Sequence, residues 1–165
     1  MVKETCCFTG HRAQKLPWGF NENDKRCIKM KKKLKKIIIT AIKNGYRDFI
    51  TGMALGFDII CAEMILYLKT FFPHIKLIGA LPCINQEKLW QPKDKERYHQ
   101  ILARLDEIHI ISRQYTGKIC MIKRNIFMLN NSSLVIALFN GQPGGTAQTL
   151  AYAKTHSIKC ITITP

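Results

Sequence analysis

Short apolar runs alternate along this chain with stretches in which apolar residues recur every three or four positions. The short runs are rich in β-branched residues, and several are almost continuously apolar, as in Leu134–Phe139. Runs of that kind are typical of parallel strands that are covered on both faces. The predicted strands are Thr5–Thr9, Tyr46–Thr51, Ile75–Leu81, Glu107–Ser112, Ser133–Phe139 and Lys159–Ile163.

The segments between these runs are predicted to be helices. In the first of them Cys27, Met30, Leu34 and Ile38 follow one another at three- and four-residue steps, and Gly45 provides a stop. The predicted helices are Asp24–Asn44, Phe57–Phe71, Pro92–Leu105, Gly117–Leu129 and Thr146–Thr155.

Strands that alternate with helices predict βαβ units with right-handed crossovers. We therefore expect an α/β, Rossmann-like, doubly wound fold with a mainly parallel sheet of five to six strands and helices on both faces. The chain has 165 residues and no internal repeat or linker, so residues 1–165 are expected to form a single domain. No apolar run reaches the ~18 residues of a membrane span, and the N-terminus lacks the apolar core of a signal peptide. The expectation is a cytoplasmic protein without membrane association.

Three of the loops that follow predicted strands contain glycine. They are Thr9–Arg12, Thr51–Asp58 and Asn140–Thr146, and each leads towards a predicted helix. Ligands of such sheets bind beyond the carboxyl ends of the strands, where glycine admits close backbone approach and helix N-termini favour anions. Together the loops predict a cradle for a phosphate-bearing ligand. The alternative is that the glycines serve the turns alone.

Charge and missing motifs narrow the classes of function. The chain has 26 Lys and Arg residues against 11 Asp and Glu residues, a formal net charge of +15. An anionic partner is therefore expected, which can be a nucleic acid, a nucleotide or an acidic surface. Neither G-x-x-x-x-G-K-[ST] nor G-x-G-x-x-G occurs, which disfavours NTPases, kinases and NAD dehydrogenases. The 7 cysteines are scattered without a C-x-x-C pair and the histidines lack ligand spacing, so no metal site is expected.

Motifs spread over nearly the whole chain resemble one protein family. They are Cys6–Arg12, Leu16–Glu22, Thr51–Asp58, Leu81–Cys83 with Gln86 and Trp90, Arg124–Asn125 and Gly144–Thr146. In this order they resemble the YpsA/YoqJ-like branch of the SLOG superfamily, which also holds the DprA (Smf) proteins and the Lonely Guy phosphoribohydrolases. The resemblance implies a Rossmann-like domain that binds a nucleotide or nucleotide-derived, ADP-ribose-like ligand. It also implies a homodimer, no required cofactor, and relatives in Firmicute genomes and prophages, most of them without an established reaction.

The resemblance and the loop positions together predict the ligand-binding residues. Arg12 is expected to pair with a phosphate, because a guanidinium suits bidentate contacts, although a surface arginine is the alternative. The full predicted set is Thr9, Gly10, His11, Arg12, Trp18, Gly52, Met53, Ala54, Gly56, Asp58, Pro82, Gln86, Trp90, Arg124, Asn125, Asn140, Gly141, Gly144, Gly145 and Thr146.

Several of these residues have a second interpretation that is purely structural. Asp58 either caps the second helix or accepts a hydrogen bond from a ribose hydroxyl. Trp18 and Trp90 either stack on a base or cover the core. Arg124 and its neighbour Asn125 belong either to the site or to the surface, and Thr146 is a helix cap, a ligand donor or both.

Whether an enzymatic function is expected depends on the acidic residues that could act as catalytic groups. The Lonely Guy pattern P-G-G-x-G-T-x-E-E is contracted here at Pro143–Leu150 and lacks the glutamate, and no Asp or Glu follows Glu107. Glycoside cleavage needs a carboxylate, for which Asp58 and Glu63 are the candidates. His11 is a further candidate, as a general acid or phosphate donor, or it is an ordinary loop imidazole. The prediction is a sensor or sequestering protein, with a nucleotide N-glycosidase as the alternative.

Lysines crowd the outer face of the first predicted helix. The segment Lys25–Lys36 holds Lys25, Arg26, Lys29, Lys31, Lys32, Lys33, Lys35 and Lys36, between its apolar positions. A solvated helix face is the default interpretation. A DprA-like contact with single-stranded nucleic acid is the alternative, although this helix lacks the interleaved aromatic residues of single-strand platforms.

Overall fold

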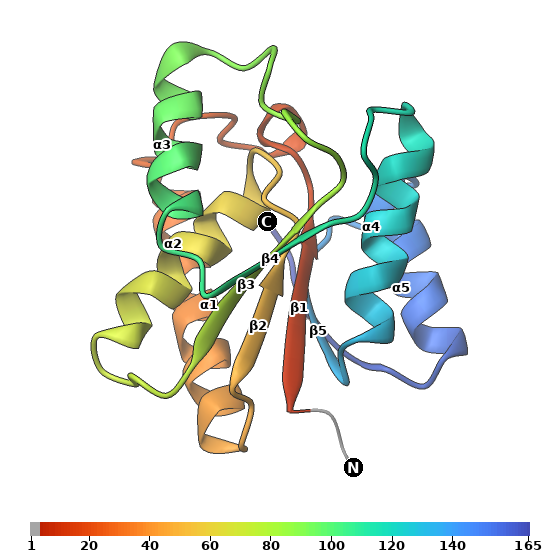
Figure 1. Ribbon diagram of the computed structural model, residues 1–165. Helices are drawn as coiled ribbons and strands as arrows, with labels where there is room; N and C mark the ends of the chain where they lie inside the picture. Colours follow the sequence, from red (N-terminus) through yellow and green to blue (C-terminus); the bar gives the residue numbers. More distant parts are fainter. Residues whose placement is uncertain (1–3) are drawn as a thin grey trace.

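A parallel β-sheet organises the computed structural model, which describes residues 4–165 (Figure 1). Within that part of the chain the sheet has six strands in the spatial order β4-β3-β2-β1-β5-β6, and every adjacent pair is parallel. The strands are β1 (Thr5–Gly10), β2 (Asp48–Thr51), β3 (Lys76–Leu81), β4 (Glu107–Ile110), β5 (Leu134–Leu138) and β6 (Lys159–Ile163).

Helices cover both faces of the sheet. In Figure 1 α1, α2 and α3 lie on one side, and α4 and α5 lie on the other. Their bounds are α1 (Lys25–Lys43), α2 (Phe57–Lys69), α3 (Pro92–Leu102), α4 (Lys118–Asn130) and α5 (Gly145–Thr155). The predicted Rossmann-like α/β fold is thereby confirmed, with a sheet that is wholly parallel in the described residues.

Element boundaries differ from the predicted ones by a few residues, for local reasons. The strand predicted from Tyr46 starts at Asp48, because Tyr46 donates its amide to Ala41 O in the turn that closes α1 around Gly45 (φ +93°). The third predicted helix ends three residues early, at Leu102. One element was not predicted: a 3-10 turn, η1, at Ala13–Lys15.

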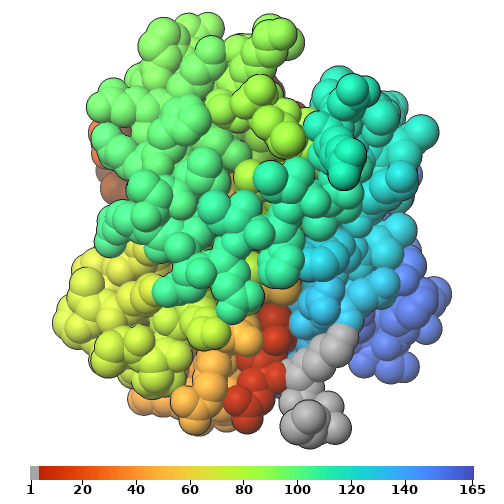
Figure 2. Space-filling view, in the orientation of Figure 1, coloured from red at the N-terminus to blue at the C-terminus, as the bar shows by residue number. Residues whose placement is uncertain are grey.

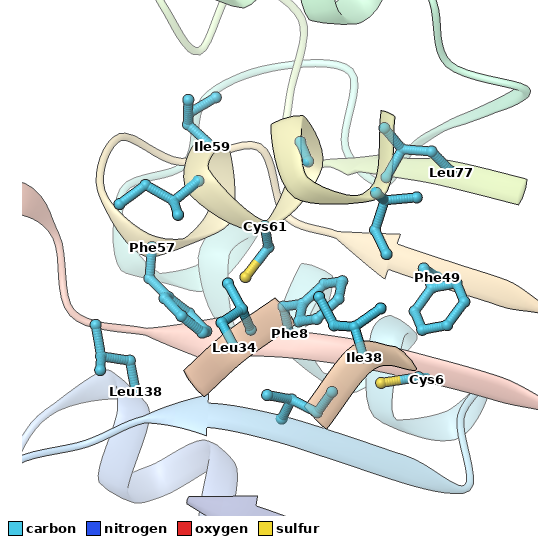
Figure 3. Packing of buried hydrophobic residues seen from close by; sticks show 14 of the residues in the cluster. Cys6, Phe8, Leu34, Ile38, Phe49, Phe57, Ile59, Cys61, Leu77 and Leu138 are labelled. Atoms are coloured by element: carbon cyan, nitrogen blue, oxygen red, sulfur yellow. The ribbon is translucent and has the colours of Figure 1, made fainter. Parts of the chain in front are cut away.

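Apolar side chains on the two sheet faces pack into two layers. The larger layer lies between the sheet and α1–α3, where Phe8 and Phe49 stack at 6.2 Å between ring centroids (Figure 3). Leu34 and Ile38 of α1 close over these rings and are wholly buried. The second layer packs β-strand residues such as Val135 against α4 and α5. Because both faces of the central strands are covered, these strands must be apolar in succession, which is the pattern seen in the sequence; the edge strands β4 and β6 are largely exposed.

Cysteines belong mainly to these layers. Six of the cysteines are buried and Cys160 is exposed, and all of them are free thiols. Burial raises the pKa of Cys7 to about 12, so this thiol stays protonated. Among residues 4–165 no group of three or more His, Cys, Asp or Glu residues is placed to hold a metal ion. No helix in the described part of the chain is long and apolar enough to span a membrane.

The strand order reverses beside β1. Successive strands run outward from β1 to β4, and the chain then returns to place β5 on the other side of β1. The connections that leave β1 and β5 therefore diverge to opposite faces of the sheet, and a crevice opens between them at the carboxyl edge. The segment before α3 and the start of α4 rise on either side of this edge (Figures 1 and 2).

Candidate functional site

A cavity of about 180 Å³ occupies the crevice at the ends of β1 and β5. Loops that lie far apart in the sequence meet there, together with the side chains of α4. Its lining comprises Phe8, Thr9, Gly10, His11, Arg12, Lys15, Ala54, Asp58, Met121, Arg124, Asn125, Met128, Gly144, Gly145 and Thr146.

The N-terminus of α5 forms one wall of this cavity. Gly144 is the N-cap, with φ +150°, and no side chain caps the helix. The first amides of an α-helix have no partner within the helix and carry the positive end of its dipole. Gly145 and Thr146 bring these amides to the cavity lining, so the wall offers hydrogen-bond donors to an anion.

Two exposed cations stand at the same cavity. Arg12 has one polar contact to another described side chain, 3.9 Å from Nη2 to Met121 Sδ. Neither Arg12 nor Lys15 forms an ion pair with any of residues 4–165. Within residues 4–165 neither charge is therefore neutralised by an ion pair, and the cavity is electropositive.

A buried ion pair lies at the back of the cavity. Arg124 Nη1 donates to Gly52 O at 2.5 Å and lies 3.4 Å from Asp58 Oδ2, which also accepts from the Ala54 amide at 3.3 Å. Both charged side chains are more than nine-tenths buried. Burial raises the pKa of Asp58, and the Arg124 guanidinium offsets part of that rise. Asp58 follows the N-cap Gly56 by two residues and holds the loop before α2 rather than capping the helix.

Glycine is required at position 52 by this arrangement. A Cβ atom there would lie 1.7 Å from Arg124 Nη1, so any side chain at this position would displace the guanidinium that donates to Gly52 O. Gly56 has φ +104°, and its Cβ would lie 2.6 Å from the Ala13 backbone nitrogen. These two glycines shape the loop from outside the cavity lining, so they support the site without touching its interior.

His11 connects the loops after β1 and β5. Its Nε2 accepts a hydrogen bond from the Asn140 amide at 3.2 Å, and its ring lies 6.0 Å from that of Phe139. Burial lowers the pKa of His11, and the nearby charge of Lys15 adds to the effect. The imidazole is therefore neutral near pH 7, with a loop amide already bonded to Nε2.

The structure brings together about half of the predicted ligand-binding residues in this cavity. These are Thr9, Gly10, His11, Arg12, Ala54, Asp58, Arg124, Asn125, Gly144, Gly145 and Thr146. Phe8, Lys15, Met121 and Met128 also line it and were not predicted. Lys15 reaches the cavity through the 3-10 turn η1, for which the sequence carries no clear periodic signal.

Other predicted residues lie elsewhere. Trp90 packs edge-on against Tyr98 at 5.2 Å, and Gln86 donates to Met53 O and to the Tyr98 hydroxyl. Glu63 pairs with Arg97, at 2.6 Å from Nε to Oε1. Four further predicted residues, Met53, Pro82, Asn140 and Gly141, are not part of the lining, and Trp18 lines a separate cavity.

A larger groove continues from the cavity between α4 and α5. It has a volume of about 510 Å³, and the two spaces share Arg12, Lys15, Met121, Asn125, Gly144 and Gly145. Ile122, Ile126 and Leu129 supply its apolar wall, and Gln148, Thr149 and Tyr152 its polar wall. The combined space therefore has one electropositive end and one less polar end.

Comparison with known proteins identifies related chains. The YpsA family model, described as the YspA SLOG family, matches residues 6–165. A SPbeta prophage-derived protein of Bacillus subtilis, YoqJ, is 36% identical over 140 residues, covering 77% of this chain and 81% of that one. A UPF0398 protein of Halalkalibacterium halodurans is 30% identical over 148 residues, covering 88% of this chain and 78% of its own.

Two solved structures share the fold. DNA processing protein A (DprA) of Streptococcus pneumoniae superposes with a TM-score of 0.65 at 14% identity, covering 96% of this chain and 49% of that one. DprA of Helicobacter pylori, described for its single-stranded DNA binding mode, gives 0.66 at 17% identity, covering 98% and 65%. The present chain thus spans about half to two thirds of these longer proteins, and at such identities the likeness establishes the fold alone.

We expect Arg124→Met to destabilise the protein by about 3–5 kcal/mol, because it leaves the Asp58 carboxylate buried without its partner. Urea unfolding measures the change. Arg113→Met is the matched control: Arg113 is exposed, and its loss should change stability by less than about 0.5 kcal/mol. The double variant Asp58→Leu/Arg124→Met should recover part of the loss. A stability of Arg124→Met equal to that of the control would contradict a role for the pair.

Acidification should weaken the fold through His11. Its pKa is lower in the folded chain than the ordinary 6.5, so the unfolded chain binds more protons as the pH falls through that value. Stability from this group is complete above pH 6.5 and declines below it. His11→Gln keeps an acceptor near the Nε2 position without a titrating group, and urea unfolding at about pH 7.5 and pH 5.5 should show a smaller decline. The exposed His74→Gln should decline as the wild type does; equal declines in all three proteins would exclude the effect.

Proposed function

The chain belongs to the YpsA SLOG family, and on that premise we propose that it binds a nucleotide or nucleotide-derived small molecule of the ADP-ribose kind. The phosphate lies in the cavity at the carboxyl ends of β1 and β5. The observation that carries the proposal is the convergence of the α5 N-terminus with Arg12 and Lys15, two cations that have no counter-ion among the described residues.

Phosphate is the anion that suits this arrangement. Arg12 has a planar fork that matches two phosphate oxygens, while Lys15 acts as a compact point charge. The amides of Gly145 and Thr146 add neutral donors along the helix axis. Asp58 is the one acidic residue in the lining, and its charge is already opposed by Arg124. The net field at the cavity therefore favours a group with more than one negative oxygen.

The sizes of the two spaces support a ligand larger than free phosphate. A volume of 180 Å³ is below the range of roughly 300–1,000 Å³ that is typical of small-molecule pockets. The adjoining groove of 510 Å³ falls within that range. We place the phosphate in the cavity and the rest of the ligand in the groove, against the side chains of Met121 and Ile122.

The contacts of the acidic side chains favour binding of the ligand over cleavage of its glycosidic bond. Asp58 accepts from the Ala54 amide and faces Arg124, so its carboxyl is committed to the loop. Glu63 is held by Arg97 outside the cavity lining. A sensor or sequestering role needs no proton donor, whereas a nucleotide N-glycosidase would have to release Asp58 from its partners. N-glycosidic cleavage stays the enzymatic alternative, tested by assaying free base after incubation with nucleotides.

Nucleotides should raise the melting temperature of the protein. At a concentration about 100 times the Kd, binding adds about 2.7 kcal/mol, or roughly 5–10 °C for a chain of this size. Arg12→Gln should weaken binding by about 10- to 100-fold, since it removes a charged hydrogen-bond donor without leaving a buried partner. Thermal shift with mononucleotides and ADP-ribose measures both effects.

Arg104→Gln is the control for that experiment, because Arg104 is an exposed arginine outside the cavity and groove. It should bind as the wild type does. No stabilisation by any phosphate-bearing ligand, or equal affinities of the two variants, would contradict the proposed site.

Single-stranded nucleic acid is the second candidate ligand, favoured by the basic face of α1. Lys31 pairs with Glu22, and Lys35 lies 4.7 Å above the Tyr67 ring, so part of the lysine cluster is already engaged. Lys25, Lys29, Lys32, Lys33 and Lys36 remain exposed. The Helicobacter pylori relative in fold is described as binding single-stranded DNA, which supports testing the same ligand here.

Reversing the charge of this face should weaken single-strand binding. The triple change of Lys29, Lys32 and Lys33 to Glu should lower affinity for a short oligonucleotide at least about tenfold and reduce the salt slope by roughly 2. Fluorescence anisotropy at several salt concentrations measures both. The matched control reverses Lys88, Lys123 and Lys154, three exposed lysines that lie outside α1, with the same change in net charge. Equal losses in the two triple variants would show that only net charge matters.

A further inference from the structure

Three cations border the groove between α4 and α5, two helices that lie side by side in Figure 1. This cation row consists of Arg12, Lys15 and Lys118, and the lining of the groove contains no Asp or Glu. The phosphate cavity shares Arg12 and Lys15 with the groove, whereas Lys118 lines the groove alone. A ligand with a single phosphate in the cavity would therefore leave Lys118 without an anion.

The contacts of the cation row spread its charges from α5 to α4. Lys15 Nζ lies 3.8 Å from the position that a Cβ atom at Gly144 would take, so its ammonium is beside the start of α5. Arg12 Nη2 lies 3.9 Å from Met121 Sδ, so its guanidinium rests on α4. Lys118 precedes Met121 by three residues and lies one turn nearer the start of α4, on the same helix face. The three charges thus extend across the groove rather than meeting at one point.

The cation row lacks carboxylate partners within residues 4–165. None of its three side chains forms an ion pair with that part of the chain. The segment 108–165, which includes α4 and α5, contains no Asp or Glu. Asp58 is the one carboxylate in the lining of the adjoining cavity, and it faces Arg124. Unopposed cations gathered in a concave lining favour a ligand with several negative groups.

The starts of α4 and α5 add to this positive field. Because every described strand is parallel, both helices begin at the carboxyl edge of the sheet. Their N-caps are Gly117 and Gly144, and neither helix has a side-chain cap. The positive ends of two helix dipoles therefore lie at the edge where the cation row stands, and they favour further negative charge there.

Beyond the cation row the groove carries no charged side chain. Its apolar wall comes from α4, and its polar wall consists of the uncharged residues Gln148, Thr149 and Tyr152. The groove volume of about 510 Å³ exceeds what a second phosphoryl group would fill. A ligand in this space would therefore place its anionic groups at the cation row and its uncharged part between the two helices.

We propose that the ligand is an organic pyrophosphate, with one phosphoryl group in the cavity at the start of α5 and the second in the groove, against Arg12 and Lys118. Arg12 lines both spaces, so its guanidinium fork serves oxygens of both groups. Lys118 is then a specificity-determining residue, because only the second phosphoryl group reaches it. This inference rests on the proposed nucleotide-binding function and narrows it to ligands with two joined phosphoryl groups.

Affinities of the intact protein for AMP, ADP and ADP-ribose test this preference. AMP has one phosphoryl group, ADP has a terminal pyrophosphate and ADP-ribose has a bridging one, while the adenosine part is the same in all three. Isothermal titration calorimetry should give a Kd for ADP, ADP-ribose or both that is about tenfold lower than the Kd for AMP. The difference between ADP and ADP-ribose shows whether the pyrophosphate is terminal or bridging.

Two lysine variants then locate the second phosphoryl group. Lys118→Gln should weaken pyrophosphate binding about tenfold and AMP binding by no more than about twofold, because it removes a charged donor that AMP does not reach. Lys123→Gln is the matched control, since Lys123 is an exposed lysine of the same helix that lines neither space. It should keep the wild-type ratio of the AMP Kd to the pyrophosphate Kd, and melting temperatures check that both variants are folded.

Two results would overturn the pyrophosphate inference and leave nucleotide binding intact. One is equal affinity of the wild type for AMP, ADP and ADP-ribose. The other is the same ratio of AMP to pyrophosphate affinity in Lys118→Gln as in Lys123→Gln. Absence of binding by all three nucleotides, AMP included, would instead contradict the proposed function itself and the pyrophosphate site with it.

Discussion

The parallel direction of all six described strands, with the reversal of strand order beside β1, is the constraint on which the rest of the structure depends. It sends every strand-to-helix connection to one edge of the sheet. At that edge Gly10–Arg12 and Asn140–Gly145 become neighbours although about 130 residues separate them in the chain. The amides that begin α5 cannot pair within their own helix, so the topology itself leaves hydrogen-bond donors where the two loops diverge.

The buried pair of Arg124 and Asp58 turns this open edge into a defined site. Arg124 belongs to α4 on one sheet face, while Gly52 lies in the loop that leads to α2 on the other face and Asp58 in the first turn of α2. Burying both charges removes much of their hydration, so the pair contributes little net stability by itself. The pair instead holds the two side chains in place. If they separated, each would be a lone buried charge, which is far less favourable than the pair. The loop and α4 are thereby fixed on two sides of the cavity.

The net charge of the chain does not show which of its charged side chains are available to a ligand. The formal charge of +15 includes lysines of α1 that pair with Glu22 or lie over Tyr67. At the phosphate cavity two cations have no counter-ion among residues 4–165, whereas in the separate cavity around Trp18 and Asp94 the charges balance. The two cavities on either side of one loop thus differ in the charge of their linings.

The sequence by itself determined the alternation of strands and helices, the parallel sheet and the glycine-bearing loops at its carboxyl edge. These features depend on local periodicity and on the backbone freedom of glycine. Both are properties of residues close together in the chain and need no contact with distant residues. Tertiary structure decided which side chains reach the site. Trp90 packs on Tyr98, Glu63 pairs with Arg97, and Lys15 enters the cavity through a 3-10 turn. Such choices depend on partners brought close only when separate helices pack on the sheet, and no local pattern of apolar and polar residues encodes them.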